Sequence, residues 1–289
     1  MSDIRPPARV FPPAREEAAT ASQQASVPQT GDPAYRLAFQ DMDFLLREDL
    51  RPVRFQLELL KPELLLDEAK IGSTFVFYGS ARIPEPDKAH ALVENAATEH
   101  QKKIAENLAA NSKYYDEARS LARIVSQVPE DEGGQRQFVV CSGGGPSIME
   151  AANRGAADVG AESIGLNIVL PHEALPNDYV TPKLSFQFHY FSLRKMHFLM
   201  RARAVAVFPG GFGTFDECFE LLTLIQTRKI KPLPIVFFGR RFWDRVVNFE
   251  ALVEEGVIAP RDLELFKYAE TAEEAWAHVR AWYAEQALA

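Results

Sequence analysis

The chain has 289 residues, a net charge of −8 and two cysteines. The acidic balance disfavours nucleic acid as the main partner, no run approaches the ~20 apolar residues that cross a bilayer, and the N-terminus lacks the apolar core of a signal peptide. We therefore expect a cytoplasmic protein that contacts no membrane, with Cys141 and Cys218 as buried free thiols rather than a disulfide.

The first 70 residues differ in composition from the rest of the chain. Residues 1–33 are rich in Pro, Ala, Gln and Ser without hydrophobic periodicity, which predicts a disordered tail. Residues 34–70 have a helical pattern that Pro52 and Pro62 are expected to interrupt. This helical extension has an apolar face formed by Leu57, Leu60, Leu64 and Leu65. We expect this face to pack on the main domain or at a subunit contact.

From residue 71 to the C-terminus, short apolar runs alternate with helical segments. The runs that we interpret as strands are 74–78, 138–141, 163–169, 204–208 and 234–238. This alternation predicts an α/β domain with a parallel, doubly wound sheet. In such sheets, ligands bind beyond the carboxyl ends of the strands.

Glycine-containing turns follow three of these strands. Their candidate ligand contacts are Gly79, Ser80, Ser142, Gly143, Gly144, Gly210, Gly211, Gly213 and Thr214. A glycine turn that opens a helix presents main-chain N–H groups to which a phosphate can bind. Neither of the two longer turns is a dinucleotide fingerprint, because Ile148 and Asp216 occupy the places of the third glycine, and this disfavours NAD.

Glu217 lies one turn into the helix that we expect to begin at Thr214. It is nearly opposite the predicted core-facing residues and shares its face with Leu221 and Leu224. The predicted core-facing residues are Phe215, Cys218, Phe219, Leu222 and Ile225. Two interpretations stay open: a ligand-contacting or catalytic carboxylate, or a capping box in which Thr214 and Glu217 close the helix start.

Arg194 and Lys195 lie on a predicted helix that leads directly into strand 204–208. A solvated helix edge would explain both cations. Because the helix leads into that strand, both can instead lie near the strand ends, where Arg suits a bidentate oxyanion contact and Lys acts as a point charge. The apolar residues of this helix, expected to face the core, are Leu193, Met196, Leu199 and Met200.

Together these residues predict a pocket for an anionic small molecule, with no metal and no cofactor. The chemistry fits hydrolysis of the N-glycosidic bond of a nucleoside 5′-monophosphate. Glu217 would stabilise an oxocarbenium-like ribose and activate water, and Arg194 would position the sugar or the carboxylate. A nucleotide-binding or carrier protein without turnover is the alternative, and the residues alone do not choose between them.

The segment from Pro209 to Glu217 resembles the PGGxGTxxE signature of the LOG ("lonely guy") family, whose members are often labelled lysine decarboxylases for historical reasons. Arg194-Lys195 and the turns at Gly79-Ser80 and Ser142 also match, and the similarity runs from about residue 72 to the C-terminus. The surroundings are most similar to the larger bacterial branch.

This resemblance implies a Rossmann-like fold and phosphoribohydrolase activity on cytokinin riboside monophosphate or AMP, as in an AMP nucleosidase. The products would be the free base and ribose 5-phosphate. It implies Arg194 and Glu217 as the catalytic pair, Lys195 and the turns as substrate contacts, and a homodimer or higher oligomer. A true lysine decarboxylase would need a pyridoxal phosphate lysine, and Lys195 is the only lysine expected near the pocket.

Overall fold

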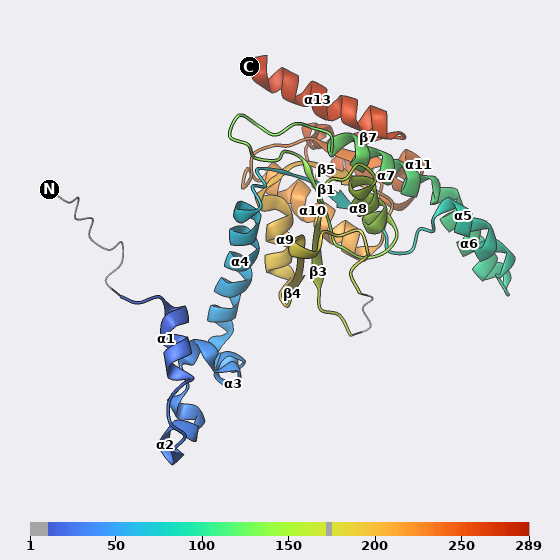
Figure 1. Cartoon of the computed structure of the whole chain (residues 1–289). Coiled ribbons are helices and arrows are strands. Elements are labelled where there is room, and N and C mark those ends of the chain that lie inside the picture. The colour runs from blue at the N-terminus through green and yellow to red at the C-terminus, as the bar shows by residue number, and fades with distance from the viewer. Residues whose placement is uncertain (1–10, 172–174, 289) are drawn as a thin grey trace. The chain divides into compact units, whose positions relative to one another are not determined.

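The computed structural model describes residues 11–171 and 175–288. The chain divides into two compact units, Met1–Glu58 and Leu59–Ala289 (Figure 1). Within the described residues, no helix has both the length and the apolar character that a membrane span requires.

The first unit contains short helices, including α1 (Ala14–Ala21), α2 (Pro28–Gly31) and α3 (Met42–Leu45). The first two fall in the predicted disordered tail and differ from that prediction. Helix α1 follows the second proline pair and precedes the Ser/Gln stretch. It consists of strong helix formers and has two acidic residues in its first turn, and the average composition of residues 1–33 did not reveal this local helical signal. Residues 1–10 of the predicted tail lie outside the described residues.

Helix α4 (Arg51–Glu68) is a single helix that continues from the first unit into the second. Pro62 lies inside it, so the predicted interruption at this residue does not occur. Leu60 and Leu64 of the predicted leucine face keep 53% and 58% of their surface exposed within this chain, so packing of this face at a subunit contact stays a prediction. Leu66, outside that predicted face, is buried instead.

Arg201 attaches the second half of α4 to the second unit. It caps the C-terminal end of α9 (Phe191–Met200). Its Nη2 lies 2.9 Å from Oε2 of Glu63 and 2.7 Å from Oδ1 of Asp67, and its Nη1 donates to the carbonyl of Ile71. The boundary between the units therefore falls after Glu58 rather than at the predicted residue 70.

The second unit is built on one seven-stranded sheet in which every neighbouring pair is parallel. The strands are β1 (Thr74–Tyr78), β2 (Val139–Ser142), β3 (Ile164–Ile168), β4 (Ser185–Phe188), β5 (Ala202–Val207), β6 (Ile235–Phe238) and β7 (Lys267–Ala269). Their order is β4-β3-β2-β1-β5-β6-β7. The prediction of a parallel, doubly wound α/β sheet is confirmed.

Helices cover both faces of this sheet (Figure 1). The remaining helices are α5 (Pro86–Glu94), α6 (Glu99–Asn111), α7 (Lys113–Val125), α8 (Ile148–Asp158), α10 (Phe212–Gln226), α11 (Arg240–Val246), α12 (Phe249–Glu254) and α13 (Ala272–Leu288). On one face, Phe75 and Phe77 join a core cluster with α7, α8 and α13. On the other, Tyr78 contacts Phe198 of α9, and Phe237 of β6 contacts Trp243 of α11.

The strand order reverses direction at β1, because β2 flanks it on one side and β5 on the other. The helices that follow these strands leave on opposite faces, so a crevice forms beyond the carboxyl ends of β1 and β5. The main chain links these ends directly, since the N–H of Ser80 donates to the carbonyl of Pro209 at 3.1 Å. The glycine turns that follow β1 and β5 therefore meet at one point of the sheet.

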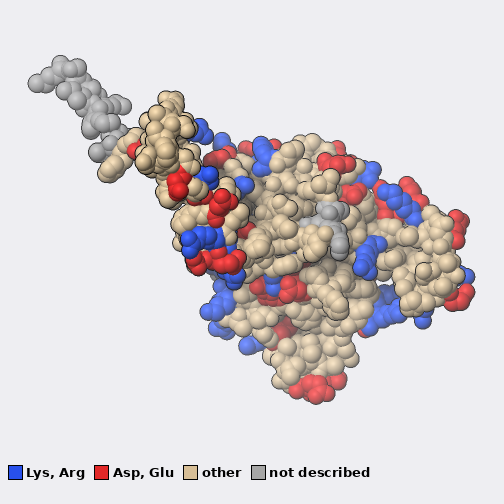
Figure 2. Space-filling model, turned by 90° about the horizontal axis from the view of Figure 1, so that it is seen from below, with Lys and Arg blue, Asp and Glu red and all other residues tan. Residues whose placement is uncertain are grey.

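Charged side chains of both signs are interspersed over the face shown in Figure 2. Lys and Arg do not form a continuous basic area on this face, in keeping with the net charge of −8. A protein that binds nucleic acid usually presents a basic stripe or patch. That nucleic acid is not a partner stays a prediction.

Candidate active site

A cleft of about 780 Å³ lies beyond the ends of β1 and β5, and we call it the strand-end cleft. The predicted site residues that line it are Gly79, Ser80, Arg194, Gly211, Gly213, Thr214 and Glu217. The lining residues that we did not predict are Ala81, Arg82, Met149, Phe212, Phe215 and Val246. The fold thus brings the first and third glycine turns together with both proposed catalytic side chains.

The helix start in this cleft is open. Helix α10 begins at Phe212, and its N-cap is Gly211, so no side chain caps the first N–H groups. Gly210 allows the turn to close over the buried Thr214, because a Cβ at Gly210 would lie 2.1 Å from Oγ1 of Thr214. The uncapped N–H groups of a 15-residue helix are available to an anion in the cleft.

The position of this N-cap tests the capping-box interpretation of Glu217. Counting from Gly211, Thr214 is already the third helical residue, and Glu217 lies one turn further along. Thr214 and Glu217 therefore do not form a capping box, and that interpretation is wrong. The carboxylate instead faces the cleft and Arg194.

Arg194 and Glu217 form a nearly buried pair. Nη2 of Arg194 lies 3.7 Å from Oε1 of Glu217, and the two side chains keep 12% and 13% of their surface exposed. Nε of Arg194 donates to the carbonyl of Leu166 at 2.8 Å, and its guanidinium lies 5.2 Å from the ring centre of Phe198. These contacts hold the guanidinium in one orientation between β3 and Glu217.

The environment of Glu217 makes its carboxyl group a weaker acid than an ordinary glutamate. Burial is the main cause that raises its pKa to about 7; the charge of Arg194 opposes this shift and that of Asp216 adds to it. A carboxyl group with a pKa near neutrality exists in both protonation states at physiological pH. This is the behaviour expected of a general acid or base rather than of a structural ion pair.

The second glycine turn does not line the cleft but lies behind Arg194. Ser142 is fully buried; its hydroxyl donates to Oδ1 of Asn153 at 2.7 Å and accepts from the N–H of Gly144 at 3.1 Å. Gly143 leaves room for the guanidinium, because a Cβ there would lie 2.8 Å from Nη2 of Arg194. Of the three predicted contacts in this turn, Gly143 lies against Arg194, and none of the three lines the cleft.

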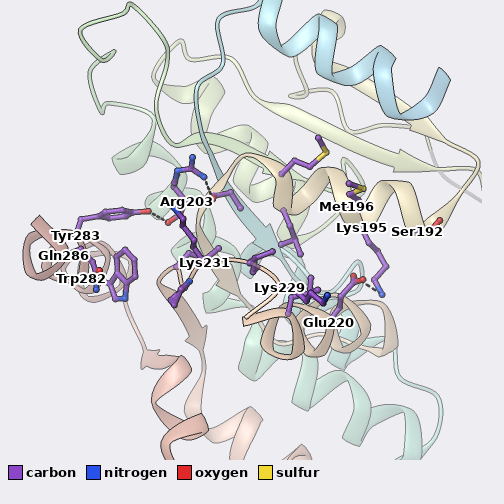
Figure 3. Close-up of a pocket in the computed structure, with 17 residues that line it drawn as sticks. Ser192, Lys195, Met196, Arg203, Glu220, Lys229, Lys231, Trp282, Tyr283 and Gln286 are labelled. Carbon is purple, nitrogen blue, oxygen red and sulfur yellow. Dashed lines mark hydrogen bonds and ion pairs between the residues drawn. The ribbon is translucent and has the colours of Figure 1, made fainter. Parts of the chain in front are cut away.

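Lys195 also points away from the cleft. Its Nζ lies 3.0 Å from Oδ1 of Asp216 and 3.0 Å from Oε2 of Glu220. It lines a second cavity of about 1000 Å³, the lateral groove, between α9, α10 and α13 (Figure 3). The groove is larger than the strand-end cleft, but Arg194, Glu217 and the glycine turns are absent from its lining.

On α9 and α10, the helix face that is buried differs from the face that the sequence predicted to be buried. Met196 and Met200 of α9 line the lateral groove and are 50% and 39% exposed, whereas Leu193 is buried as predicted. On α10, Leu221 is fully buried within the chain, so of the two leucines predicted to share the face of Glu217 only Leu224 lines the groove. Hydrophobic period locates the apolar residues of a helix but not which of them meet the sheet.

The cleft residues that sequence reasoning missed come mostly from neighbouring elements. Arg82 follows the Gly79-Ser80 turn, and its backbone N–H donates to Oγ of Ser80 at 2.9 Å. Because Arg82 lies two residues after the candidate contact Ser80, the sequence could have indicated that it lines the cleft. Val246, at the end of α11, has no such signal, because only the fold brings this helix to the cleft.

Among the described residues, no group of three or more His, Cys, Asp and Glu side chains is placed to hold a metal ion. Cys141 and Cys218 are free and buried, and burial raises the pKa of both thiols. A buried thiol with a raised pKa is a poor nucleophile. Neither cysteine therefore adds chemistry to the site.

The arrangement of Arg194, the glycine turn and Glu217 lies within a segment that is similar to a known family. Residues 149–279 match the family model described as "Possible lysine decarboxylase". The lysine decarboxylase-type match runs from α8 into α13, so it includes both proposed catalytic residues and the α10 turn. The turns at Gly79 and Ser142 precede it.

Comparison with other proteins adds similarity at low identity. No curated protein matches. Among solved structures, the structural genomics target TM1055 is 20% identical over 72% of this chain and 99% of its own, with a TM-score of 0.45. Two structures of the molybdenum cofactor carrier protein from Chlamydomonas reinhardtii are 17% and 18% identical over 73% and 74% of this chain and 99% of their own, with TM-scores of 0.40 and 0.42. These similarities assign no function to the chain.

Proposed function

We propose that the protein is a phosphoribohydrolase that cleaves the N-glycosidic bond of a nucleoside 5′-monophosphate. The products are the free base and ribose 5-phosphate. The observation that carries the proposal is the nearly buried Arg194–Glu217 pair beside the uncapped start of α10. The resemblance of the Pro209–Glu217 segment to the LOG signature, and the family match over 149–279, support the same assignment.

The phosphate group is assigned to the start of α10. The main-chain N–H groups after Gly211 and the positive end of the helix dipole favour a dianion there. Arg82 lines the same cleft and is exposed, and it makes no ion pair within the part of the chain that the structure describes, so it is available as a second phosphate ligand. A nucleotide anchored in this way places its ribose toward Glu217.

Glu217 supplies the chemistry at the sugar. The C1′–N bond breaks with its electron pair moving to the base, which takes up a proton, and positive charge develops on the ribose ring. The ionised carboxylate stabilises this charge and accepts a proton from the attacking water, whose oxygen bonds to C1′; release of this proton to solvent balances the proton that the base takes up from solvent. Arg194, fixed by Leu166, orients the carboxylate and contacts the ribose hydroxyls.

The same geometry disfavours lysine decarboxylation. Decarboxylation with pyridoxal phosphate needs a lysine inside the pocket to form the Schiff base. No lysine lines the strand-end cleft, as far as the described residues extend, and Lys195 is engaged by two carboxylates on the wall of the lateral groove. A purified protein with a pyridoxal absorbance band would contradict this assignment.

The activity should depend on pH through Glu217. Because burial raises its pKa to about 7 and the ionised form is the active one, kcat/KM should rise with pH between about 6 and 8 and then level off. A profile from pH 5 to 9 with AMP measures this. The affinity for AMP, followed in parallel, separates the titration of Glu217 from that of the substrate phosphate near pH 6. A profile that falls through pH 7 would contradict the role of Glu217 as a base.

The direct test is a panel of nucleoside 5′-monophosphates assayed for ribose 5-phosphate. We expect turnover of AMP or of N6-isopentenyl AMP, and none of the corresponding nucleosides, which lack the phosphate. The panel also identifies the preferred base. Tight binding of several monophosphates without turnover of any would favour the carrier alternative.

We further infer a homodimer or higher oligomer located in the cytoplasm. The exposed Met196 and Met200 of the lateral groove are apolar surface that a subunit contact would cover, and the family resemblance points the same way. The free, buried cysteines are in keeping with a reducing compartment. Light scattering of the full chain tests the assembly, and a monomer at all concentrations would contradict it.

A further inference from the structure

Lys195 is adjacent to Arg194 in sequence but takes no part in the strand-end cleft. Figure 3 shows its side chain in the lateral groove, paired with Glu220. Its second partner, Asp216, also belongs to α10, and the two acidic residues lie on either side of Glu217 in sequence. The ammonium group therefore binds the helix that carries the catalytic carboxylate.

This contact joins the two catalytic helices. Arg194 is on α9 and Glu217 is on α10, and their own ion pair is long at 3.7 Å. Lys195 connects the same helices by two shorter ion pairs of 3.0 Å. Only 17% of the Lys195 side chain is exposed, against 58% of Asp216 and 37% of Glu220, so solvent screens these pairs in part.

The charged residues of this network also affect the pKa of Glu217. On α10, Asp216 and Glu220 raise its pKa, while Arg194 and Lys195 of α9 lower it. The other titratable groups that interact with Glu217 are Tyr78 of β1, Cys141 of β2 and Cys218 of α10. These three are neutral near pH 7 because their pKa values are raised, so the balance around Glu217 is set by the four charged residues.

We propose that Lys195 is a positioning residue: it clamps α10 to α9 and balances Asp216 and Glu220, so that Arg194 and Glu217 keep their spacing and charge. The inference rests on the proposed hydrolase function. It replaces the substrate contact that the sequence predicted for Lys195. Loss of the clamp should therefore change the protonation of Glu217 and turnover, but not nucleotide binding.

The test compares Lys195→Met with Lys195→Arg, using AMP. Lys195→Met should lower kcat at pH 7 about five-fold to ten-fold, leave KM within about two-fold, and move the midpoint of the pH–rate profile upward by about one unit. Activity should then recover above pH 8. Lys195→Arg should restore the wild-type midpoint. Lys229→Met is the matched control: Lys229 lines the same groove and is exposed, and it should behave as wild type.

Asp216→Asn keeps the proposal testable if Lys195→Met does not fold. Asp216 is 58% exposed, and removing its charge should move the midpoint downward, opposite to the effect at Lys195. A KM raised more than ten-fold in Lys195→Met with an unmoved pH profile would show a substrate contact and overturn the clamp. Equal loss of kcat at every pH would show a merely structural role and would also overturn it.

A second readout separates this proposal from the proposed function. The Glu217 carboxyl can be titrated by ¹³C NMR of glutamate-labelled protein, with Glu217→Gln to assign the signal. An upward shift of its midpoint in Lys195→Met supports the clamp even if wild type turns over no nucleotide, and an unshifted midpoint overturns it. Absence of wild-type turnover contradicts only the hydrolase.

Discussion

Replacing Glu217 by glutamine should lower base release from AMP by at least 100-fold, while the affinity for AMP changes little. The amide keeps the size and the cleft contacts of the side chain but can neither stabilise the positive ribose nor take up a proton from water. Removal of one preorganised charge-stabilising group in other enzymes has effects of about 10²–10³ on kcat. Ribose 5-phosphate release and calorimetric titration with AMP measure the two quantities.

The same substitution should make the protein more stable above neutral pH. Burial raises the pKa of Glu217 from 4.5 to about 7, so the stability of the wild type is full below pH 4.5 and decreases as the pH rises toward 7. Glutamine resembles the protonated acid and avoids this loss, which corresponds to about 3 kcal/mol at most. Thermal unfolding at pH 5 and pH 8 should show a clearly larger gain for the variant at pH 8.

Glu255→Gln is the control for both measurements, because Glu255 is an exposed residue at the end of α12 and should change neither activity nor stability. A Glu217→Gln protein with more than a tenth of the wild-type activity would remove the chemical basis of the proposed function. A variant that loses AMP binding as well as turnover would instead place Glu217 among the binding groups.

Arg194→Lys should lower kcat/KM for AMP by about 100-fold or more, although the charge is retained. The guanidinium donates to the carbonyl of Leu166 through Nε and at the same time extends Nη2 toward Glu217. An ammonium group is a single point charge and cannot make both contacts in one orientation. Without the contact to Leu166, the cation is free to move away from the ribose, and misplacement of a positioning group by about 1 Å alone can reduce rates about 100-fold.

Arg241→Lys is a matched control, since Arg241 is an exposed arginine of α11 that does not line the cleft. Steady-state kinetics with AMP for both variants, together with thermal unfolding, separates loss of function from loss of folding. Wild-type kcat/KM in Arg194→Lys would show that the site needs only a positive charge, and the role given to the fixed guanidinium would be wrong.

The parts of the fold that the sequence predicted depend on local patterns. The buried strands read as short apolar runs, so β1 matches its predicted range, 74–78, and β6 differs by one residue at its start. Parallel sheets follow from the alternation of such runs with helices. The meeting of the Gly79 and Gly210 turns then follows from β1 and β5 being neighbours.

The parts that the sequence did not predict depend on rotation and on distant neighbours. Arg194 and Lys195 are consecutive, so their side chains on a helix point about 100° apart, and only one of them can face a given cleft. Which one does depends on how α9 packs, and this is set by Leu193 and Phe198 against the sheet. Leu221 was likewise placed with Glu217 on the face opposite the predicted core-facing residues, whereas Leu221 is fully buried and Glu217 is nearly buried.

The attachment of α4 through Arg201 determines how far the N-terminus can be shortened. A chain beginning at residue 59 retains Glu63 and Asp67, whereas a chain beginning at residue 71 loses both carboxylates that pair with Arg201 and the buried side chain of Leu66. Loss of a buried leucine side chain alone typically costs about 2–5 kcal/mol. The longer truncation should therefore melt at a clearly lower temperature, and equal melting temperatures would refute this. We therefore expect the shortest chain that folds stably to include the last ten residues of α4, although this helix begins in the first unit.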